Sequence, residues 1–138
     1  MKKLILTIAL VSSLCMAEIY KPKLEDGREI EISHINKKKI HFIIRKNGEV
    51  LLSGEAYDEY GGWEGDDENG SGYEVVEYWY QNNNQCSLSV RIQDMPIDEN
   101  DKKERIRIKN AKDCIVSKTL QKSFSNDNEL FYRNKQWK

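Results

Sequence analysis

The 138-residue sequence has no apolar run long enough to cross a membrane and no stretch with a sustained helical period. A membrane-spanning helix takes about 20 apolar residues, whereas the run from Leu4 to Val11 is shorter and is interrupted by Thr7. Elsewhere, apolar residues tend to recur at every second position, as they do in half-buried strands. These absences argue against a stable membrane span after this run, and the alternation favours an all-β fold.

Histidine and cysteine are also scarce, with two and three residues, and acidic residues slightly outnumber basic ones. His34 and His41 have no Cys or His partner at the spacing of zinc ligands, so we predict no metal site. No nucleophile elbow surrounds Ser53 or Ser71, and we predict no catalytic residue and no cofactor. Because the formal net charge is −1, we expect no binding of nucleic acid, which requires a basic face.

The N-terminal residues have the order of a secretory signal peptide. Two lysines precede the apolar run from Leu4 to Val11, and a small residue, Ala17, stands at the expected cleavage point. We therefore predict a signal peptide over residues 1–17 and a single β-rich domain over residues 18–138 that is periplasmic or secreted. A retained membrane anchor and a lipid-anchored Cys15 are the alternatives to cleavage.

Removal of the signal peptide leaves Cys86 and Cys114 as the cysteines of the mature domain. In an oxidising compartment, we expect these two residues to form a disulfide. The disulfide would close a loop of about 29 residues and stabilise a small domain by roughly 3 to 4 kcal/mol. Two separate thiols buried in the core are the alternative.

Alternation of polar and apolar residues predicts a small antiparallel sheet, sandwich or barrel of about seven strands. The clearest hairpin surrounds Asn47-Gly48, because Asn-Gly suits a type I′ turn. This turn pairs Lys46 with Glu49, which are opposite charges. It then pairs Ile44 with Leu51, so the register is consistent along the hairpin. We also expect a lead-in over Glu18 to Gly27, strands over Glu29 to Ser33, Arg105 to Lys109, Cys114 to Val116 and Glu129 to Arg133, and a turn over Asn110 to Asp113.

A second hairpin is predicted from the apolar segments Tyr73 to Tyr80 and Cys86 to Ile92. A three-residue loop, Asn82 to Asn84, pairs Tyr80 with Cys86 and gives a continuous apolar face. A four-residue loop would place polar residues opposite apolar ones. We therefore expect the three-residue loop.

If successive strands run up and down, alternate connections share an end of the sheet. The short turns then lie together at one end, at 47–48, 82–84 and 110–113. The long segments 58–72 and 93–103 lie at the other end. Cys86 and Cys114 both fall at the short-turn end and at the same height, as a disulfide requires.

The segment 58–72 is the candidate functional region, because it combines glycine, acidic and aromatic residues in a long connection. We predict a binding surface with aromatic anchors and acidic steering charges. The predicted binding residues are Tyr60, Trp63, Glu64, Asp66, Asp67, Glu68, Ser71 and Tyr73. The expected partner is a protein or envelope component with a basic surface. A solvated acidic loop that its aromatic residues fasten to the sheet is the alternative.

Calcium is an alternative ligand for this acidic segment. With Gly70 at the invariant glycine of an EF-hand, Gly65 and Val76 stand where Asp and Glu belong, so an EF-hand is excluded. An irregular site over residues 66–69 would instead make the protein a calcium-stabilised envelope component. A small hydrolase with paired carboxylates is a further alternative, which would require an enclosed cleft.

Ser71-Gly72-Tyr73 resembles the Ser-Gly-…-Tyr signature of bacterial periplasmic lysozyme inhibitors, which are small exported β domains with disulfides. In that family one or two residues separate Gly from Tyr, whereas none does here. The resemblance covers these three residues. It implies an inhibitor-like role toward a basic cell-wall hydrolase that is attracted by opposite charge.

Overall fold

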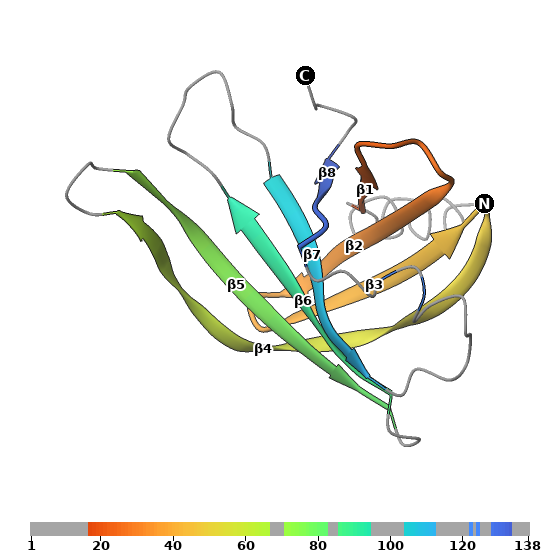
Figure 1. The fold of residues 1–138 in the computed structure, drawn as a ribbon. Helices are drawn as coiled ribbons and strands as arrows, with labels where there is room; N and C mark the ends of the chain where they lie inside the picture. Colours follow the sequence, from red (N-terminus) through yellow and green to blue (C-terminus); the bar gives the residue numbers. More distant parts are fainter. Residues whose placement is uncertain are drawn as a thin grey trace, which may run out of the picture.

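The computed structural model describes residues 17–66, 71–82, 86–94, 104–112, 122, 124 and 128–133, and eight strands lie within them. In chain order the strands are β1 (Glu18–Pro22), β2 (Arg28–Asn36), β3 (Lys39–Lys46), β4 (Glu49–Asp66), β5 (Ser71–Gln81), β6 (Ser87–Asp94), β7 (Glu104–Lys112) and β8 (Phe131–Arg133). Each strand pairs antiparallel with the next, and β8 pairs with β1, so the sheet closes into a barrel (Figure 1). The predicted all-β antiparallel class is confirmed, with a barrel as its architecture.

The barrel has eight strands where the sequence predicted about seven. The segment of β1 was expected as an edge or a lead-in, and it pairs with β2 on one side and with β8 on the other. The last predicted strand, Glu129 to Arg133, is found as β8. The turn predicted over Asn110 to Asp113 is wrong for residues 110–112, because these residues continue β7.

Two sequence predictions fall on residues that the structure does not describe. The signal peptide lies there except for Ala17, and so does the strand expected over Cys114 to Val116. Both stay predictions. Within the described ranges, no helix is long and apolar enough to cross a membrane.

Alternate side chains of the strands pack together inside the barrel. On β2 and β3, buried Ile30 pairs with Ile44 and buried Ile32 pairs with Phe42. An eight-stranded barrel has an interior just wide enough for side chains to fill. Full burial of a large apolar side chain stabilises the fold by about 1.5 to 3 kcal/mol relative to exposure. The largest fully buried side chains of this core are Tyr20, Phe42, Phe131, Ile30, Ile32, Ile40, Ile44, Leu88, Ile106 and Val90.

The β3–β4 hairpin confirms the predicted turn and the first predicted pair. The turn residues Asn47-Gly48 have φ angles of 52° and 82°, as a type I′ turn requires, and the opposite charges beside them pair. The second predicted pair is wrong, because a β-bulge after Ile44 shifts its partner from Leu51 to Leu52. The extra residue allows two consecutive leucines to be buried, which strict alternation does not.

β5 and β6 form the second predicted hairpin with a register shifted by two residues. Tyr80 pairs with Leu88 rather than with Cys86. Because the shift is even, the same side chains still face the core. The three-residue loop is wrong, since the connection spans residues 82–86. Asn82 closes it, because its N–H donates to the Cys86 carbonyl at 3.0 Å and its side-chain oxygen accepts from the Cys86 N–H at 3.1 Å.

The connections between β4 and β5 and between β6 and β7 leave from the same end of the barrel, as predicted. Glu74 pairs with Asp94, and Asp94 pairs with Glu104. The start of β5, the end of β6 and the start of β7 are therefore neighbours. The connections between β4 and β5 and between β6 and β7 thus leave from one end.

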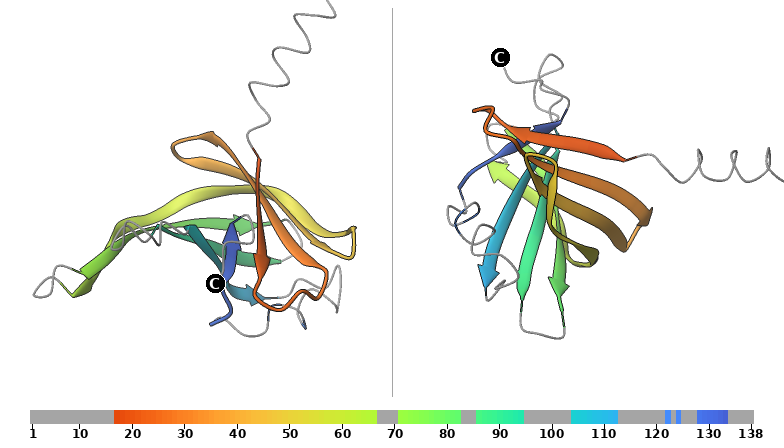
Figure 2. Two further views of the ribbon diagram at one scale, coloured as in Figure 1. Left: turned by 90° about the horizontal axis from the view of Figure 1, so that it is seen from above. Right: turned by 90° about the vertical axis from the view of Figure 1, so that its right-hand side faces the viewer.

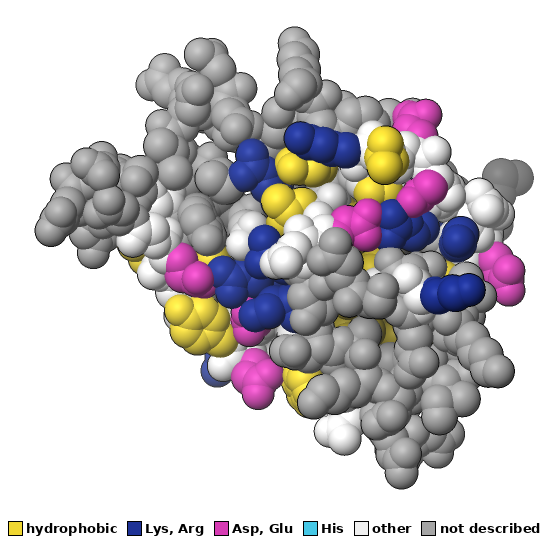
Figure 3. Space-filling view, viewed as in Figure 1, with side chains coloured by type: hydrophobic (Ala, Val, Ile, Leu, Met, Phe, Trp, Pro, Cys, Tyr) yellow, Lys and Arg dark blue, Asp and Glu magenta, His cyan; other side chains and the backbone are white. Residues whose placement is uncertain are grey.

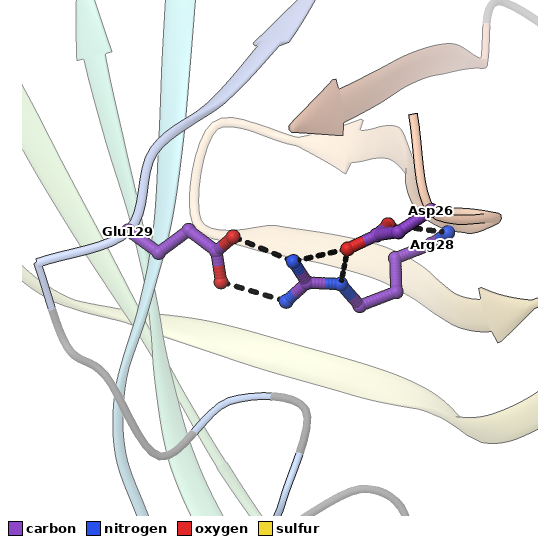
Figure 4. A network of polar contacts seen from close by, with 3 residues as sticks. All are labelled: Asp26, Arg28 and Glu129. Atoms are coloured by element: carbon purple, nitrogen blue, oxygen red, sulfur yellow. Dashed lines mark hydrogen bonds and ion pairs between the residues drawn. The ribbon is translucent and has the colours of Figure 1, made fainter. Parts of the chain in front are cut away.

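Arg28 connects β2 to the segment before β8 (Figure 4). Its guanidinium donates hydrogen bonds of 2.6 Å to each carboxylate oxygen of Glu129, and its Nε donates to Asp26 at 2.7 Å. The guanidinium also lies over the rings of Phe131 and Phe124, at 5.6 Å and 6.0 Å from their centroids. The hydrogen bond with Glu129 raises the pKa of Arg28 by more than burial lowers it. These contacts tie the segment before β8 to the start of β2.

We expect Arg28→Met to lower the free energy of unfolding by about 2 kcal/mol, since hydrogen bonds to charged groups contribute about 1.5 to 3 kcal/mol. Arg45→Met is the matched control, because Arg45 makes an ion pair with Glu31 at 3.3 Å. Such a pair contributes at most about 1 kcal/mol. Urea unfolding followed by tryptophan fluorescence measures both variants. Equal losses of unfolding free energy in the two variants would show that the contacts of Arg28 stabilise the fold no more than the ion pair of Arg45 does.

Candidate functional site

β4 and β5 continue beyond the barrel as a two-stranded ribbon. β4 follows β3 up to Tyr57, and the N–H of Asp58 donates to the Lys38 carbonyl at 2.8 Å. Over residues 59–66, β4 pairs only with β5 among the described residues, and residues 71–73 of β5 precede its first pairing with β6. We call residues 59–66 and 71–73 the ribbon. Figure 2 shows this hairpin reaching away from the body of the barrel.

The prediction of a loop over residues 58–72 is therefore wrong, apart from residues 67–70, which lie outside the described residues. Glycine and acidic residues have low β propensity, and the sequence of this segment therefore did not indicate a strand. Pairing with β5 overrides that propensity.

A β-bulge at Glu59 decides which side chains of the ribbon share a face. Asp58 pairs with Tyr78, but Tyr60 pairs with Glu77, so Glu59 is the extra residue on β4. The alternation of side chains is reversed beyond this point.

Tyr60 and Trp63 consequently lie on opposite faces of the ribbon. Trp63 pairs with Glu74, and its indole covers Gly72 so closely that a Cβ there would come within 2.4 Å of it. Only glycine permits this packing. Tyr60 remains 45% exposed and Trp63 51% exposed. Exposed aromatic side chains on a projecting element are typical of a binding surface.

Trp63 also borders a pocket of about 310 Å³ where the ribbon joins the barrel. Its other lining residues are Gly62, Glu74, Val75 and Val76. Val75 is fully buried, whereas Glu74 is exposed. The pocket is therefore bordered by aliphatic, aromatic and acidic residues.

Glu64 belongs to an ion-pair network that attaches the ribbon to the barrel. Its carboxylate contacts Arg91 of β6, and Arg91 donates to Glu77 of β5 at 2.9 Å. Lys109 of β7 lies 3.3 Å from the same oxygen of Glu77. Burial raises the pKa of Glu77, but hydrogen bonds from Arg91 and Lys109 outweigh it and hold that pKa below its ordinary value. Glu64 therefore orients the ribbon and is not a free charge.

The other predicted binding residues lie at or beyond the end of the ribbon. Asp66 pairs with Ser71, and Tyr73 pairs with Glu64. Asp67 and Glu68, and with them most of the alternative calcium site, lie outside the described residues. In the described part of the chain, no group of three His, Cys, Asp or Glu side chains could hold a metal ion.

Arg91, Glu77 and Lys109 were not among the site residues predicted from the sequence. The predicted register placed Ser89 opposite Glu77, whereas the observed register pairs Glu77 directly with Arg91. Opposite charges that face each other across two strands stabilise the pairing. A comparison of registers by charge pairing would have favoured the observed one.

Comparisons of the chain with protein-family models, with curated proteins and with solved structures found no match. The resemblance to lysozyme inhibitors therefore stays confined to Ser71-Gly72-Tyr73. In the structure these residues begin β5, where they pair with residues 64–66 at the end of the ribbon.

Protonation of Glu77 links the network to pH. Its folded-state pKa is lowered, so between that pKa and the unfolded value of about 4.3 the unfolded state binds more protons. The carboxylate's contribution to stability is fully present above the unfolded value and is lost as the pH falls through the folded-state pKa.

We expect the free energy of unfolding to fall more steeply below about pH 4 in the wild type than in Glu77→Gln. Urea unfolding at a series of pH values measures the two slopes. Glu55→Gln is the control, because Glu55 is exposed and makes a weaker contact of 3.5 Å with Lys39. If the free energy of unfolding depended on pH in the same way in the wild type and in Glu77→Gln, Glu77 would not be the cause of the loss of stability at low pH.

Proposed function

We propose that the mature chain is an exported, non-catalytic binding protein that contacts a partner protein through the ribbon. The observation that supports this most is the projection of the ribbon past the barrel, with β4 paired on one side only among the described residues. Such a strand edge exposes backbone N–H and C=O groups, and proteins ordinarily cover or shorten these edges. A partner that covers the edge would gain main-chain hydrogen bonds as well as side-chain contacts.

The shape of the ribbon suits a partner that has a cleft. Tyr60 and Trp63 are exposed on opposite faces, so a flat surface would contact one of them, whereas the two walls of a cleft contact both. The exposed acids Asp58, Glu59 and Glu74 favour a basic cleft and attract it by opposite charge. A basic cell-wall hydrolase fits this description in the predicted compartment.

We expect Tyr60→Ala with Trp63→Ala to weaken binding to a purified basic lysozyme by at least about tenfold. The reason is that aromatic anchors at the centre of an interface contribute about 2 kcal/mol or more each. Surface plasmon resonance with immobilised lysozyme measures the affinity. Added salt should slow association of the wild type, because opposite charges steer the encounter.

Val50→Ala is the matched control for this experiment, since Val50 is exposed on β4 at the opposite end of the strand. It should bind as the wild type does. Equal binding by the wild type and the double variant would reject the ribbon as the contact. Failure of the wild type to bind would reject lysozyme as the partner.

We further propose that export is accompanied by a disulfide between Cys86 and Cys114. Cys86 is buried and comes directly before β6. Ser87 pairs with Lys112, the last residue of β7, so Cys86 lies beside the end of that strand. Cys114 follows Lys112 by two residues in the sequence. Cys114 itself lies outside the described residues. This proximity supports the pairing, since a disulfide joins Cα atoms about 4.4 to 6.8 Å apart.

We expect Cys114→Ser to lower the free energy of unfolding by about 3 kcal/mol. Intact mass of the secreted protein, after alkylation in denaturant without reductant, checks the bond and the start of the mature chain together. An unmodified chain that begins at Glu18 is the expected result. Two alkylated cysteines would instead indicate separate buried thiols.

A further inference from the structure

The outer face of β6 and β7 carries a cluster of basic side chains. Arg91 of β6 pairs directly with Arg107 of β7. Arg105 and Lys109 flank Arg107 on the same face, because they alternate with buried isoleucines. We call these four residues the basic face. Figure 3 shows Lys and Arg side chains gathered over this part of the barrel, beside acidic ones.

Negative charges are distributed unevenly over the basic face. Arg91 and Lys109 share Glu77, and Arg91 also contacts Glu64. None of the ion pairs between described residues includes Arg107, which lies directly opposite another arginine. Like charges opposite each other in a sheet are destabilising, so this position favours an additional negative charge.

Arg107 also has a buried donor without an acceptor. Its Nε and that of Arg91 are buried, and neither has a hydrogen-bond partner among the described residues. A buried donor without an acceptor is unfavourable. The nitrogens of a guanidinium form a fork that matches two oxygens of a carboxylate or phosphate. Glu64 already brings a carboxylate from the ribbon to Arg91, so this face is suited to oxyanions.

We propose that the basic face binds the oxyanion group of a ligand, a carboxylate or a phosphate, with Arg107 as the main contact. Arg105 lies over the Tyr132 ring at 5.4 Å from its centroid and adds positive charge beside the site. A nucleic acid does not fit, because the carboxylates of Glu64 and Glu77 lie among these side chains and a polyanion requires several phosphate contacts. The site suits a single oxyanion and does not depend on the ribbon contact proposed above.

The test is titration of the full mature chain with sodium phosphate and, separately, with sodium acetate, at an ionic strength held constant with sodium chloride. NMR signals of the arginine Nε–H groups report on binding. A saturable shift of the Arg107 signal is expected with at least one of the two anions. The anion that binds more tightly identifies the oxyanion as a phosphate or a carboxylate.

Three variants separate recognition from general charge effects. Arg107→Gln should lose the saturable shifts elsewhere on the face, and Arg107→Lys should bind about tenfold more weakly, because lysine keeps the charge but lacks the fork. Arg45→Gln is the control on the outer face of β3 and should bind as the wild type does. Wild-type titration curves in Arg107→Gln, or shifts that chloride reproduces, would overturn the proposal.

Stability provides a second readout that is independent of binding. In chloride, Arg107→Gln should unfold at the same urea concentration as the wild type or at a higher one, because the repulsion between Arg107 and Arg91 is removed. In phosphate or acetate, the wild type should gain stability and the variant should not. A variant less stable than the wild type in chloride would show that Arg107 has a structural role, which also overturns the proposal.

Discussion

Arg28 holds both carboxylate oxygens of Glu129, and this contact fixes the chain immediately before β8. β8 spans only Phe131–Arg133, so its ladders with β7 and β1 supply few hydrogen bonds. The guanidinium that binds Glu129 also packs on the ring of Phe131, which is fully buried in the core. The ion pair with Glu129, the packing on Phe131 and the pairing of β8 with β1 and β7 therefore all act where β8 closes the barrel.

The ribbon differs from the closed part of the barrel in the exposure of its strand edge. A closed barrel covers the edges of its strands, which protects them from pairing with other chains. Among the described residues, β4 has a neighbour on one side only over residues 59–66, and the contact between Glu64 and Arg91 holds it in position. In the proposed function, an element fixed in this way loses less conformational entropy on binding a partner. The same network leaves Arg107 without a described counter-charge, so the arrangement that orients the ribbon also creates the basic face.

Local chemistry was readable from the sequence, whereas long-range packing was not. Asn47-Gly48 specified its turn because the backbone angles it adopts are a property of those two residues. The bulges after Ile44 and at Glu59 could not be read, because nothing in the order of residues states which one is extra. The prediction of an aromatic surface at Tyr60 depended only on composition, but the division of the aromatics between two faces depended on a bulge.

The bulge at Glu59 also restricts how this region can vary in length. Gain or loss of one residue between Asp58 and Trp63 would exchange the two faces of the ribbon, and Glu64 would then turn away from Arg91. Gain or loss of two residues would lengthen or shorten the ribbon and leave each side chain on its own face. The side chains of the ribbon therefore keep their faces only when the length of this region changes by an even number of residues.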